Sequence, residues 1–133
     1  PVCAWKLPEN HYLIADQGNG RVLEIDRQGS LLWMYPFPKN ERLPVLNFTY
    51  RMENGHTLIA SDKIVEVNGK GEIVWEYDKL TNTDVRQAYR LNDGTYIIDF
   101  VHLVKRGINQ EVMLLDQSNK IRWKHYYSQH RYI

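Results

Sequence analysis

The amino-acid sequence predicts an all-β fold made of three copies of a four-stranded unit. Two sequence blocks predict this fold, because they recur three times in the same order along 133 residues. In addition, no segment combines a 3.6-residue apolar period with helix caps. One supersecondary unit repeated at a regular spacing is typical of repeat architectures.

Each unit begins with a hairpin. The hairpin block occupies residues 7–14, 52–59 and 91–98, which align without gaps. An aromatic-x-apolar strand leads into the turn at residues 5–7, 50–52 and 89–91. Asn54-Gly55 and Asp93-Gly94 tolerate the positive φ of two-residue hairpins, and Glu9-Asn10 takes their place in the first unit. The second strand follows at residues 12–15, 57–60 and 96–99.

The second block supplies the third and fourth strands. Its β-branched and aliphatic residues predict a third strand at residues 22–26, 64–68 and 112–116. A turn residue then lies four places before a tryptophan in every unit. These turn residues are Gly29, Gly71 and Asn119, and the tryptophans are Trp33, Trp75 and Trp123. The fourth strands are predicted at residues 31–35, 73–77 and 121–126.

Four-stranded units of roughly 40–50 residues are typical of the blades of a β-propeller. The predicted blades span about residues 2–36, 46–78 and 85–127 of a single domain, residues 1–133. A twelve-stranded β-sandwich is the alternative. It does not require the same turn chemistry and the same tryptophan to recur at matching places, so the sequence favours the propeller.

Composition excludes several classes of protein. The chain is 43% hydrophobic, which is enough to form one core, and its 25% charged residues are an average content. The lone Cys3 excludes a disulfide framework and a multi-cysteine metal site. A net charge of +1 favours neither nucleic acid nor a membrane as a partner, and the apolar runs are too short for a transmembrane helix. We predict no metal and no cofactor. Pro1 leaves open a removed initiator methionine or a cleaved signal peptide, and an extracytoplasmic location is favoured.

Several stretches resemble repeats of known propeller families. Residues 13–26 are similar to the NHL-type repeat, and residues 53–59 and 71–77 are similar to repeats of PQQ-like and arylsulfotransferase-like propellers. The resemblance covers roughly residues 3–127 and concerns turns and blade cores, so it implies a fold rather than an activity. Arylsulfotransferases use a histidine nucleophile, but no motif places that role on a histidine of this chain.

Three blades leave two blade faces without a neighbour. Each face would be an apolar patch of at least several hundred Å², which a soluble monomer rarely exposes. At six-blade geometry three blades span half a turn, and a two-fold axis would close the ring with a second chain. We therefore expect a homodimer. A different half-propeller chain as the partner, or a longer propeller of which this chain is a fragment, stays open.

The third unit departs from the repeat by an insertion at residues 99–110. Its alternating pattern predicts a longer hairpin with Arg106-Gly107 at the tip. His102, Lys105 and Arg106 could bind a small anionic ligand there, such as a carboxylate, sulfate or phosphate. A solvated basic tip, or a contact with the neighbouring chain, explains the same residues.

The links between blades supply the other candidate ligand-binding residues. Arg42 lies in the first link, and Asp84 and Arg86 lie at the end of the second. Side chains from these links could line the axial mouth of the ring. Ordinary surface loops explain them equally well.

Other recurring residues have a structural interpretation. The three tryptophans fit between blades as core residues better than they fit a sugar-binding set. Asp26, Asn68 and Asp116 recur after the third strand, where such side chains bond the backbone of the next turn. The basic and aromatic stretch at residues 120–133 fits a strand with one solvated face better than a nucleic-acid site.

The sequence thus favours a non-enzymatic binding or interaction module with its site on the axial face. The alternative is an enzyme of the arylsulfotransferase-like or hydrolytic propeller class, with His102 as its weak catalytic candidate. Such an enzyme needs a histidine and a carboxylate partner that converge on the axial pocket. The sequence contains no phosphate-binding loop, nucleophile elbow or helical His-Glu pair.

Overall fold

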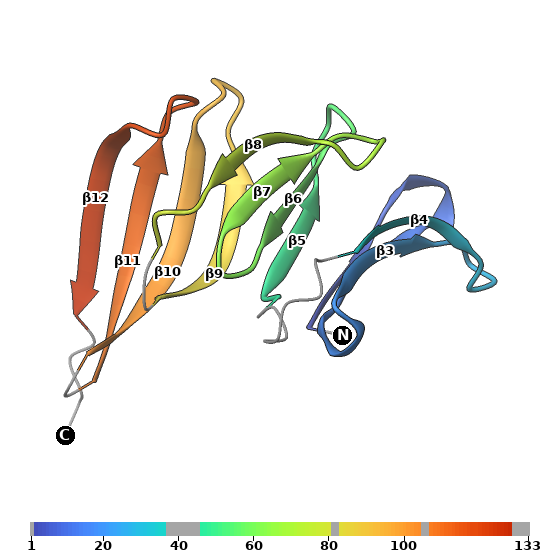
Figure 1. The fold of residues 1–133 in the computed structure, drawn as a ribbon, viewed down its shortest axis with the longest axis horizontal. Helices are drawn as coiled ribbons and strands as arrows, with labels where there is room; N and C mark the ends of the chain where they lie inside the picture. Colours follow the sequence, from blue (N-terminus) through green and yellow to red (C-terminus); the bar gives the residue numbers. More distant parts are fainter. Residues whose placement is uncertain (1, 37–45, 81–82, 105–106, 129–133) are drawn as a thin grey trace.

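A computed structural model describes residues 2–36, 46–80, 83–104 and 107–128 of the chain. Its strands form three four-stranded antiparallel sheets, and each sheet is made of four consecutive strands in simple up-and-down order. We call each sheet a blade. The blades follow one another in chain order across the molecule (Figure 1).

The strand bounds are as follows. Blade 1 comprises β1 (Cys3–Lys6), β2 (Tyr12–Asp16), β3 (Arg21–Ile25) and β4 (Leu31–Pro36). Blade 2 comprises β5 (Phe48–Arg51), β6 (Thr57–Ala60), β7 (Ile64–Val67) and β8 (Ile73–Tyr77). Blade 3 comprises β9 (Thr83–Arg90), β10 (Tyr96–Val104), β11 (Gly107–Leu115) and β12 (Ile121–Ser128). The short 3-10 turns η1 (Pro8–Asn10) and η2 (Gln17–Asn19) lie in blade 1, and no helix within the described ranges is long and apolar enough to cross a membrane.

The turn of the first hairpin differs from the predicted two-residue turn in blades 2 and 3. In blade 2, the Met52 amide donates to the His56 carbonyl at 2.8 Å, so three residues close the loop. Gly55 has a φ of 85°, while Asn54 keeps a negative φ and accepts a bond from the His56 amide through its side chain. A type I turn followed by one left-handed residue matches strand twist as well as a two-residue turn does. The prediction is therefore wrong about loop length and right about the need for glycine.

The turn between the third and fourth strands confirms the structural interpretation of the recurring Asp and Asn residues. Asp26 Oδ1 accepts hydrogen bonds from the amides of Gln28 and Ser30, at 2.9 and 2.8 Å. Asn68 and Asp116 make the same pair of bonds in the other blades. The left-handed residues that follow them are Gly29, Gly71 and Asn119.

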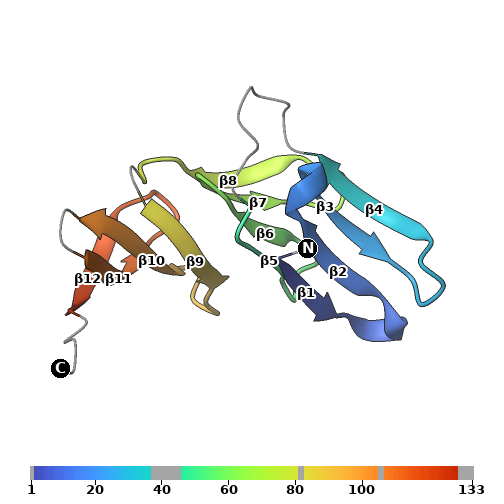
Figure 2. The same ribbon diagram turned by 90° about the horizontal axis from the view of Figure 1, so that it is seen from below.

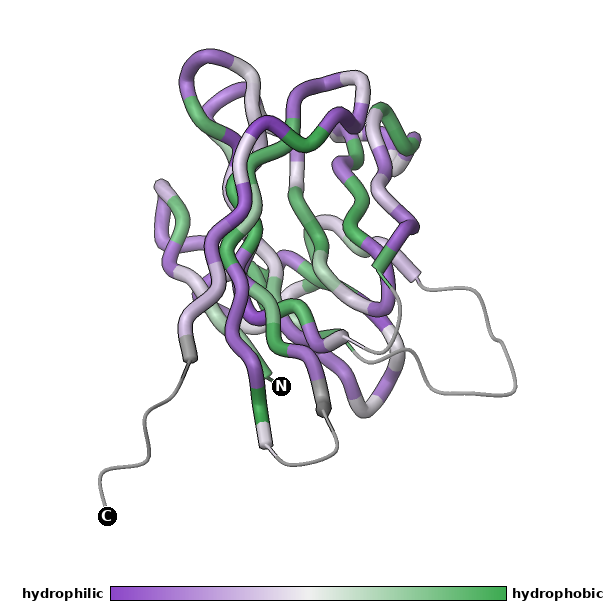
Figure 3. The backbone as a smooth tube through the Cα atoms, turned by 90° about the vertical axis from the view of Figure 1, so that its left-hand side faces the viewer, coloured by the Kyte–Doolittle hydropathy of each residue, from purple (hydrophilic) through white to green (hydrophobic). Residues whose placement is uncertain are grey.

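Two apolar cores lie between the blades. The core between blades 1 and 2 joins Leu13, Ala15 and Val22 to Ile59, Val65 and Val67. The core between blades 2 and 3 includes Leu58, Ile64 and Phe48 on one side and Ile98, Phe100 and Met113 on the other. Hydrophobic stretches follow the strands, whereas the turns at their ends are mainly hydrophilic (Figure 3). Each interior blade face is thus buried against its neighbour.

The first strand of each blade lies on the side where the blades converge. β1 contacts β5, and β5 contacts β9. The fourth strands β4, β8 and β12 lie on the outside of the fan that the blades form (Figure 2). The side chains of β1, β5 and β9 therefore meet near the axis, which makes this region the place to look for a site.

The tryptophan of the fourth strand contacts the next blade in blades 1 and 2. Trp33 is half-buried and donates its indole N–H to the Gly69 carbonyl of blade 2 at 3.2 Å. Trp75 stacks on Tyr96 of blade 3 with ring centroids 3.7 Å apart. Trp123 is 47% exposed. The core position is thus seen for Trp33 and Trp75, and for Trp123 it stays a prediction that depends on a neighbouring blade.

Candidate functional site

Aromatic side chains gather where the first strands meet. The rings of Trp5 and Tyr50 lie 6.2 Å apart, and those of Tyr50 and Tyr89 lie 5.2 Å apart, both in edge-to-face contact. Phe48 makes ring contacts with both Trp5 and Tyr89. Burial raises the pKa of the Tyr89 phenol. We call Trp5, Tyr50 and Tyr89 the axial aromatic row; each comes from a different blade.

A first hollow opens beside this row between blades 1 and 2. Its volume is about 360 Å³, within the size range of small-molecule sites. Charged and apolar groups both line it. The lining residues are Trp5, Lys6, Leu7, Pro8, Tyr50, Arg51, Met52 and Glu53.

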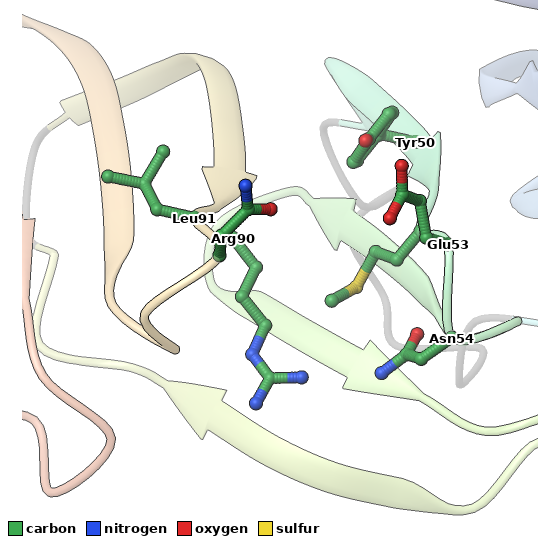
Figure 4. Close-up of a pocket in the computed structure, with 7 residues that line it drawn as sticks. Tyr50, Glu53, Asn54, Arg90 and Leu91 are labelled. Carbon is green, nitrogen blue, oxygen red and sulfur yellow. The ribbon is translucent and has the colours of Figure 1, made fainter.

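A second hollow lies between the hairpins of blades 2 and 3. Its volume is about 250 Å³. It shares Tyr50, Met52 and Glu53 with the first hollow, and its other lining residues are Asn54, Arg90, Leu91 and Asn92. In Figure 4, Arg90 and Asn54 extend toward one another from opposite sides, and Glu53 points toward Tyr50. The two hollows therefore adjoin at these shared residues, and we call their combined lining the axial rim.

An arginine at the end of a first strand borders each hollow. Arg51 donates to Glu24 of blade 1 at 2.9 Å and to Thr57 Oγ1 at 3.0 Å. Its guanidinium also lies 5.4 Å from the centre of the Trp33 ring. Arg51 is thus held by a carboxylate, a hydroxyl and an aromatic face, and it fastens blade 2 to blade 1.

Arg90 occupies the same position of blade 3 in a different environment. Its Nη1 lies 3.7 Å from Glu66 Oε1, too far for a hydrogen bond. Its Nε atom is buried and has no hydrogen-bond partner among the described residues. The sequence repeat alone does not distinguish Arg90 from Arg51.

The structure places the predicted candidates away from both hollows. His102 Nε2 lies 2.7 Å from Glu111 Oε2, and Lys124 Nζ lies 3.2 Å from the other oxygen of that buried carboxylate. The bond to Glu111 raises the pKa of Lys124. Asp84 and Arg86 are exposed on β9. Neither hollow is lined by His102, Asp84 or Arg86, and the candidates Arg42, Lys105 and Arg106 lie outside the described residues.

Histidine and glutamate form a pair in every blade. The other pairs join His11 to Glu24 at 2.9 Å and His56 to Glu66 at 2.7 Å. The three glutamates are largely or fully buried, and none of the paired side chains lines either hollow. Within the described ranges, no three His, Cys, Asp or Glu side chains lie together as a metal site.

Sequence reasoning missed the axial aromatic row, although a signal for it was present. The aromatic-x-apolar pattern recurs at the start of every hairpin and was interpreted as a strand pattern only. Which edge of a sheet faces the axis depends on how the blades pack. The pattern therefore predicts a strand but not an aromatic surface.

Comparisons with known proteins show the fold. No protein-family model matches the sequence, and no curated protein matches it. A solved protein of unknown function from Bacteroides caccae is similar with a TM-score of 0.69 at 15% identity, covering 90% of this chain. A streptogramin B lyase is similar with a TM-score of 0.57 at 12% identity, covering 95% of this chain. The fold is a β-propeller.

A third similar structure is a catalytically inactive virginiamycin B lyase from Staphylococcus aureus with quinupristin. Its TM-score is 0.57 at 10% identity, over 97% of this chain. The chain spans 41%, 53% and 55% of the lengths of these three structures, in the order given. The predicted all-β propeller class is confirmed, while the resemblance to NHL-type, PQQ-like and arylsulfotransferase-like repeats stays a prediction.

Proposed function

We propose that this chain is a non-enzymatic binding module whose site is the axial rim. The observation that carries the proposal is that the first strand of every blade brings an aromatic ring to the axis. Trp5 remains 38% exposed there, beside a hollow large enough for a small molecule. Tyr50 and Tyr89 are partly buried, so the row both packs on the core and presents aromatic surface to the hollow.

The lining of the first hollow indicates a ligand with an apolar body and a few polar groups. Trp5, Tyr50 and Met52 offer flat or flexible apolar surface. Lys6, Arg51 and Glu53 add charges of both signs at its border. A ligand group that bonds these charges would fix the orientation of the apolar part.

An enzyme that uses the His102–Glu111 pair is the second candidate. The separation of 2.7 Å supports it, because a carboxylate at this distance orients an imidazole for proton transfer. Against it, Glu111 also pairs with Lys124, so this cluster can act as a structural fastening within blade 3. The likeness to lyases at such low identity supports a fold and not their activity.

We further infer that a second copy of the chain covers the two end faces. On β12 of blade 3, Trp123 is 47% exposed and Tyr127, which points to the same face, is 49% exposed. Trp123 occupies the repeat position of Trp75, which an adjoining blade partly covers. An added blade at each end would bury these surfaces, and a two-fold arrangement supplies both at once.

Chemical-shift mapping of a small-molecule fragment library on the labelled chain tests the binding module. We expect the shifted signals to cluster at the Trp5 indole, the Tyr50 ring and the Met52 methyl group. Trp5→Ala should abolish this binding, and Val74→Ala, which trims an exposed apolar side chain that lines neither hollow, should leave it intact. Fragments that instead shift His102, Asp84 and Arg86 and ignore Trp5→Ala would contradict the proposed site.

A further inference from the structure

Arg90 carries a half-buried guanidinium that makes no hydrogen bond with the described part of the chain. Its side chain is 28% exposed, and its Nε atom is buried without an acceptor. A guanidinium has five N–H donors, and buried donors without partners are costly and rare. Arg51, at the same repeat position, uses two of its donors within the fold.

The difference follows from a single change between the blades. Thr57, which accepts the Nε bond of Arg51, is replaced at the repeat position by Tyr96. The Tyr96 hydroxyl donates to Glu66 Oε2, and His56 takes the other oxygen at 2.7 Å. Both oxygens of Glu66 thus have close partners, and Arg90 is left at 3.7 Å. Tyr96 both removes the acceptor of Arg90 and occupies its carboxylate.

The second hollow lies directly beside this guanidinium. The Oδ1 atom of Asn54 accepts the His56 amide, so its amide N–H groups remain available as donors toward the hollow. Asn92 adds a second side-chain amide. Met52 and Leu91 supply apolar surface in the same hollow. Donors from Arg90 and Asn54 therefore face the hollow from opposite sides, and Met52 adds an apolar surface to a lining that is mainly polar.

We propose that the second hollow binds a small organic monocarboxylate, with Arg90 as the residue that holds the carboxylate. A carboxylate accepts parallel N–H bonds from a guanidinium, and the part of the Arg90 guanidinium that is not buried would supply them. The apolar part of the ligand would lie against Met52. This inference rests on the proposed binding function of the axial rim and names the chemistry of one part of it.

Glu53 disfavours ligands with more than one negative charge. It is exposed and has no ion pair with the described residues, and it lines the hollow near Tyr50, away from Arg90. A second negative charge on the ligand would meet this carboxylate. The site should therefore prefer a monocarboxylate to phosphate or to a dicarboxylate.

The test uses benzoate as the probe and benzamide as its neutral match, observed through the arginine Nε–Hε signals of the labelled chain. We expect benzoate to shift the Arg90 signal and the side-chain amides of Asn54 and Asn92 in a saturable manner. The Arg51 signal should stay in place, because Thr57 already holds its Nε. Benzamide and inorganic phosphate should bind at least about tenfold more weakly than benzoate.

Variants separate a specific site from general charge attraction. Arg90→Gln should weaken benzoate binding at least about tenfold, and Arg90→Lys, which keeps the charge and loses the planar fork, should weaken it less. Arg86→Gln removes an exposed arginine from the same strand and should have no effect. Glu53→Gln should leave benzoate binding intact or tighter and should admit phosphate. If Arg90→Gln fails to fold, Arg90→Lys alone carries the comparison.

Three outcomes overturn the proposal: an unmoved Arg90 signal, equal shifts at Arg51 and Arg90, or equal losses in Arg86→Gln and Arg90→Gln. Its failure is distinguishable from failure of the proposed function. Fragments that still bind at Trp5 while benzoate ignores Arg90 would retain the axial module and reject the carboxylate site. Benzoate binding at Arg90 without any fragment at Trp5 would retain the carboxylate site and reject the binding site beside Trp5.

Discussion

Glu24 and Glu66 occupy the same position of successive blades, and each joins its own blade to the next. Glu24 bonds Arg51 of blade 2, and Glu66 bonds Tyr96 of blade 3. Both carboxylates are largely withdrawn from water. Removing one partner of such a buried group leaves an uncompensated charge, which is far more destabilising than the loss of a surface ion pair.

Tyr96 makes the stability of the interface between blades 2 and 3 sensitive to alkaline pH. Burial, and then the bond to Glu66, raise the pKa of Tyr96 above its usual value near 10. The unfolded chain releases this proton first, so the free energy of unfolding falls as the pH rises above about 10. Tyr96→Phe should cost about 2 kcal/mol at pH 7, because it leaves an oxygen of the buried Glu66 without its donor, and should reduce the alkaline loss.

Urea unfolding at neutral and alkaline pH checks this prediction. The comparison of interest is the difference in unfolding free energy between the two pH values, in the wild-type chain and in Tyr96→Phe. An identical alkaline loss in both proteins would show that Tyr96 does not contribute to it.

Asp116 gives the opposite pH dependence at the turn of blade 3. Hydrogen bonds from the Ser118 hydroxyl and the Lys120 amide, and the charge of Arg122, lower the pKa of Asp116 to about 2. Stability from this carboxylate is present above the unfolded pKa of about 4 and is lost as the pH falls toward 2. Asp116→Asn should remove this acid dependence while keeping the turn, because Asn68 fills the same role in blade 2.

Asp116→Ala serves as the contrast, since it removes the acceptor itself. We expect it to lower the unfolding midpoint at every pH, whereas Asp116→Asn differs from the wild type chiefly at neutral pH. Thermal unfolding between pH 7 and pH 2 measures both. Equal acid sensitivity in Asp116→Asn and the wild type would refute the assignment.

At the scale of elements, the turns depend on a few residues with left-handed backbone. Gly29 has a φ of 85°, and a Cβ added there would meet nothing within 4 Å. Gly29→Ala should therefore cost about 1 kcal/mol from backbone strain alone. Gly18→Ala is the matched control, because Gly18 is equally open and has no positive φ. Chemical denaturation of the two variants gives the comparison, and equal stabilities would contradict it.

In blade 3 the long hairpin was predictable from the sequence, but the bulge within it was not. The alternating pattern around Phe100 and His102 predicts a longer hairpin, and β10 and β11 extend as expected. The register shift between Asp99 and Phe100, which makes Arg86 the extra residue of β9, was not predictable. A bulge depends on pairing with a strand far along the chain and leaves no local signature in this sequence.

At the scale of the whole molecule, the proposed homodimer predicts the mass of the protein in solution. We expect light scattering coupled to size exclusion to give the mass of two chains, and the mass should persist on dilution. Trp123→Ser should shift the mass toward one chain. Trp75, at the same repeat position, packs against the next blade, and Trp123 would make the matching contact with the second copy. Val74→Ser is the control, since Val74 is 50% exposed on an interior blade. A stable monomer of the wild-type chain would exclude the homodimer.

The sequence by itself determined the repeat, the strands and the turns of this propeller. The turn residues Gly29 and Asn68 and the alternation within each strand act over a few neighbouring residues. Both can therefore be recognised in the sequence without knowledge of tertiary contacts. Tertiary structure alone decided the exposure of Trp123, the axial aromatic row and the missing hydrogen bond of the Arg90 Nε. Tyr96 and Glu66, whose bond sets Arg90 apart from Arg51, lie 30 residues apart. Their meeting depends on how one blade packs on the next, because packing selects which side chains share a buried space.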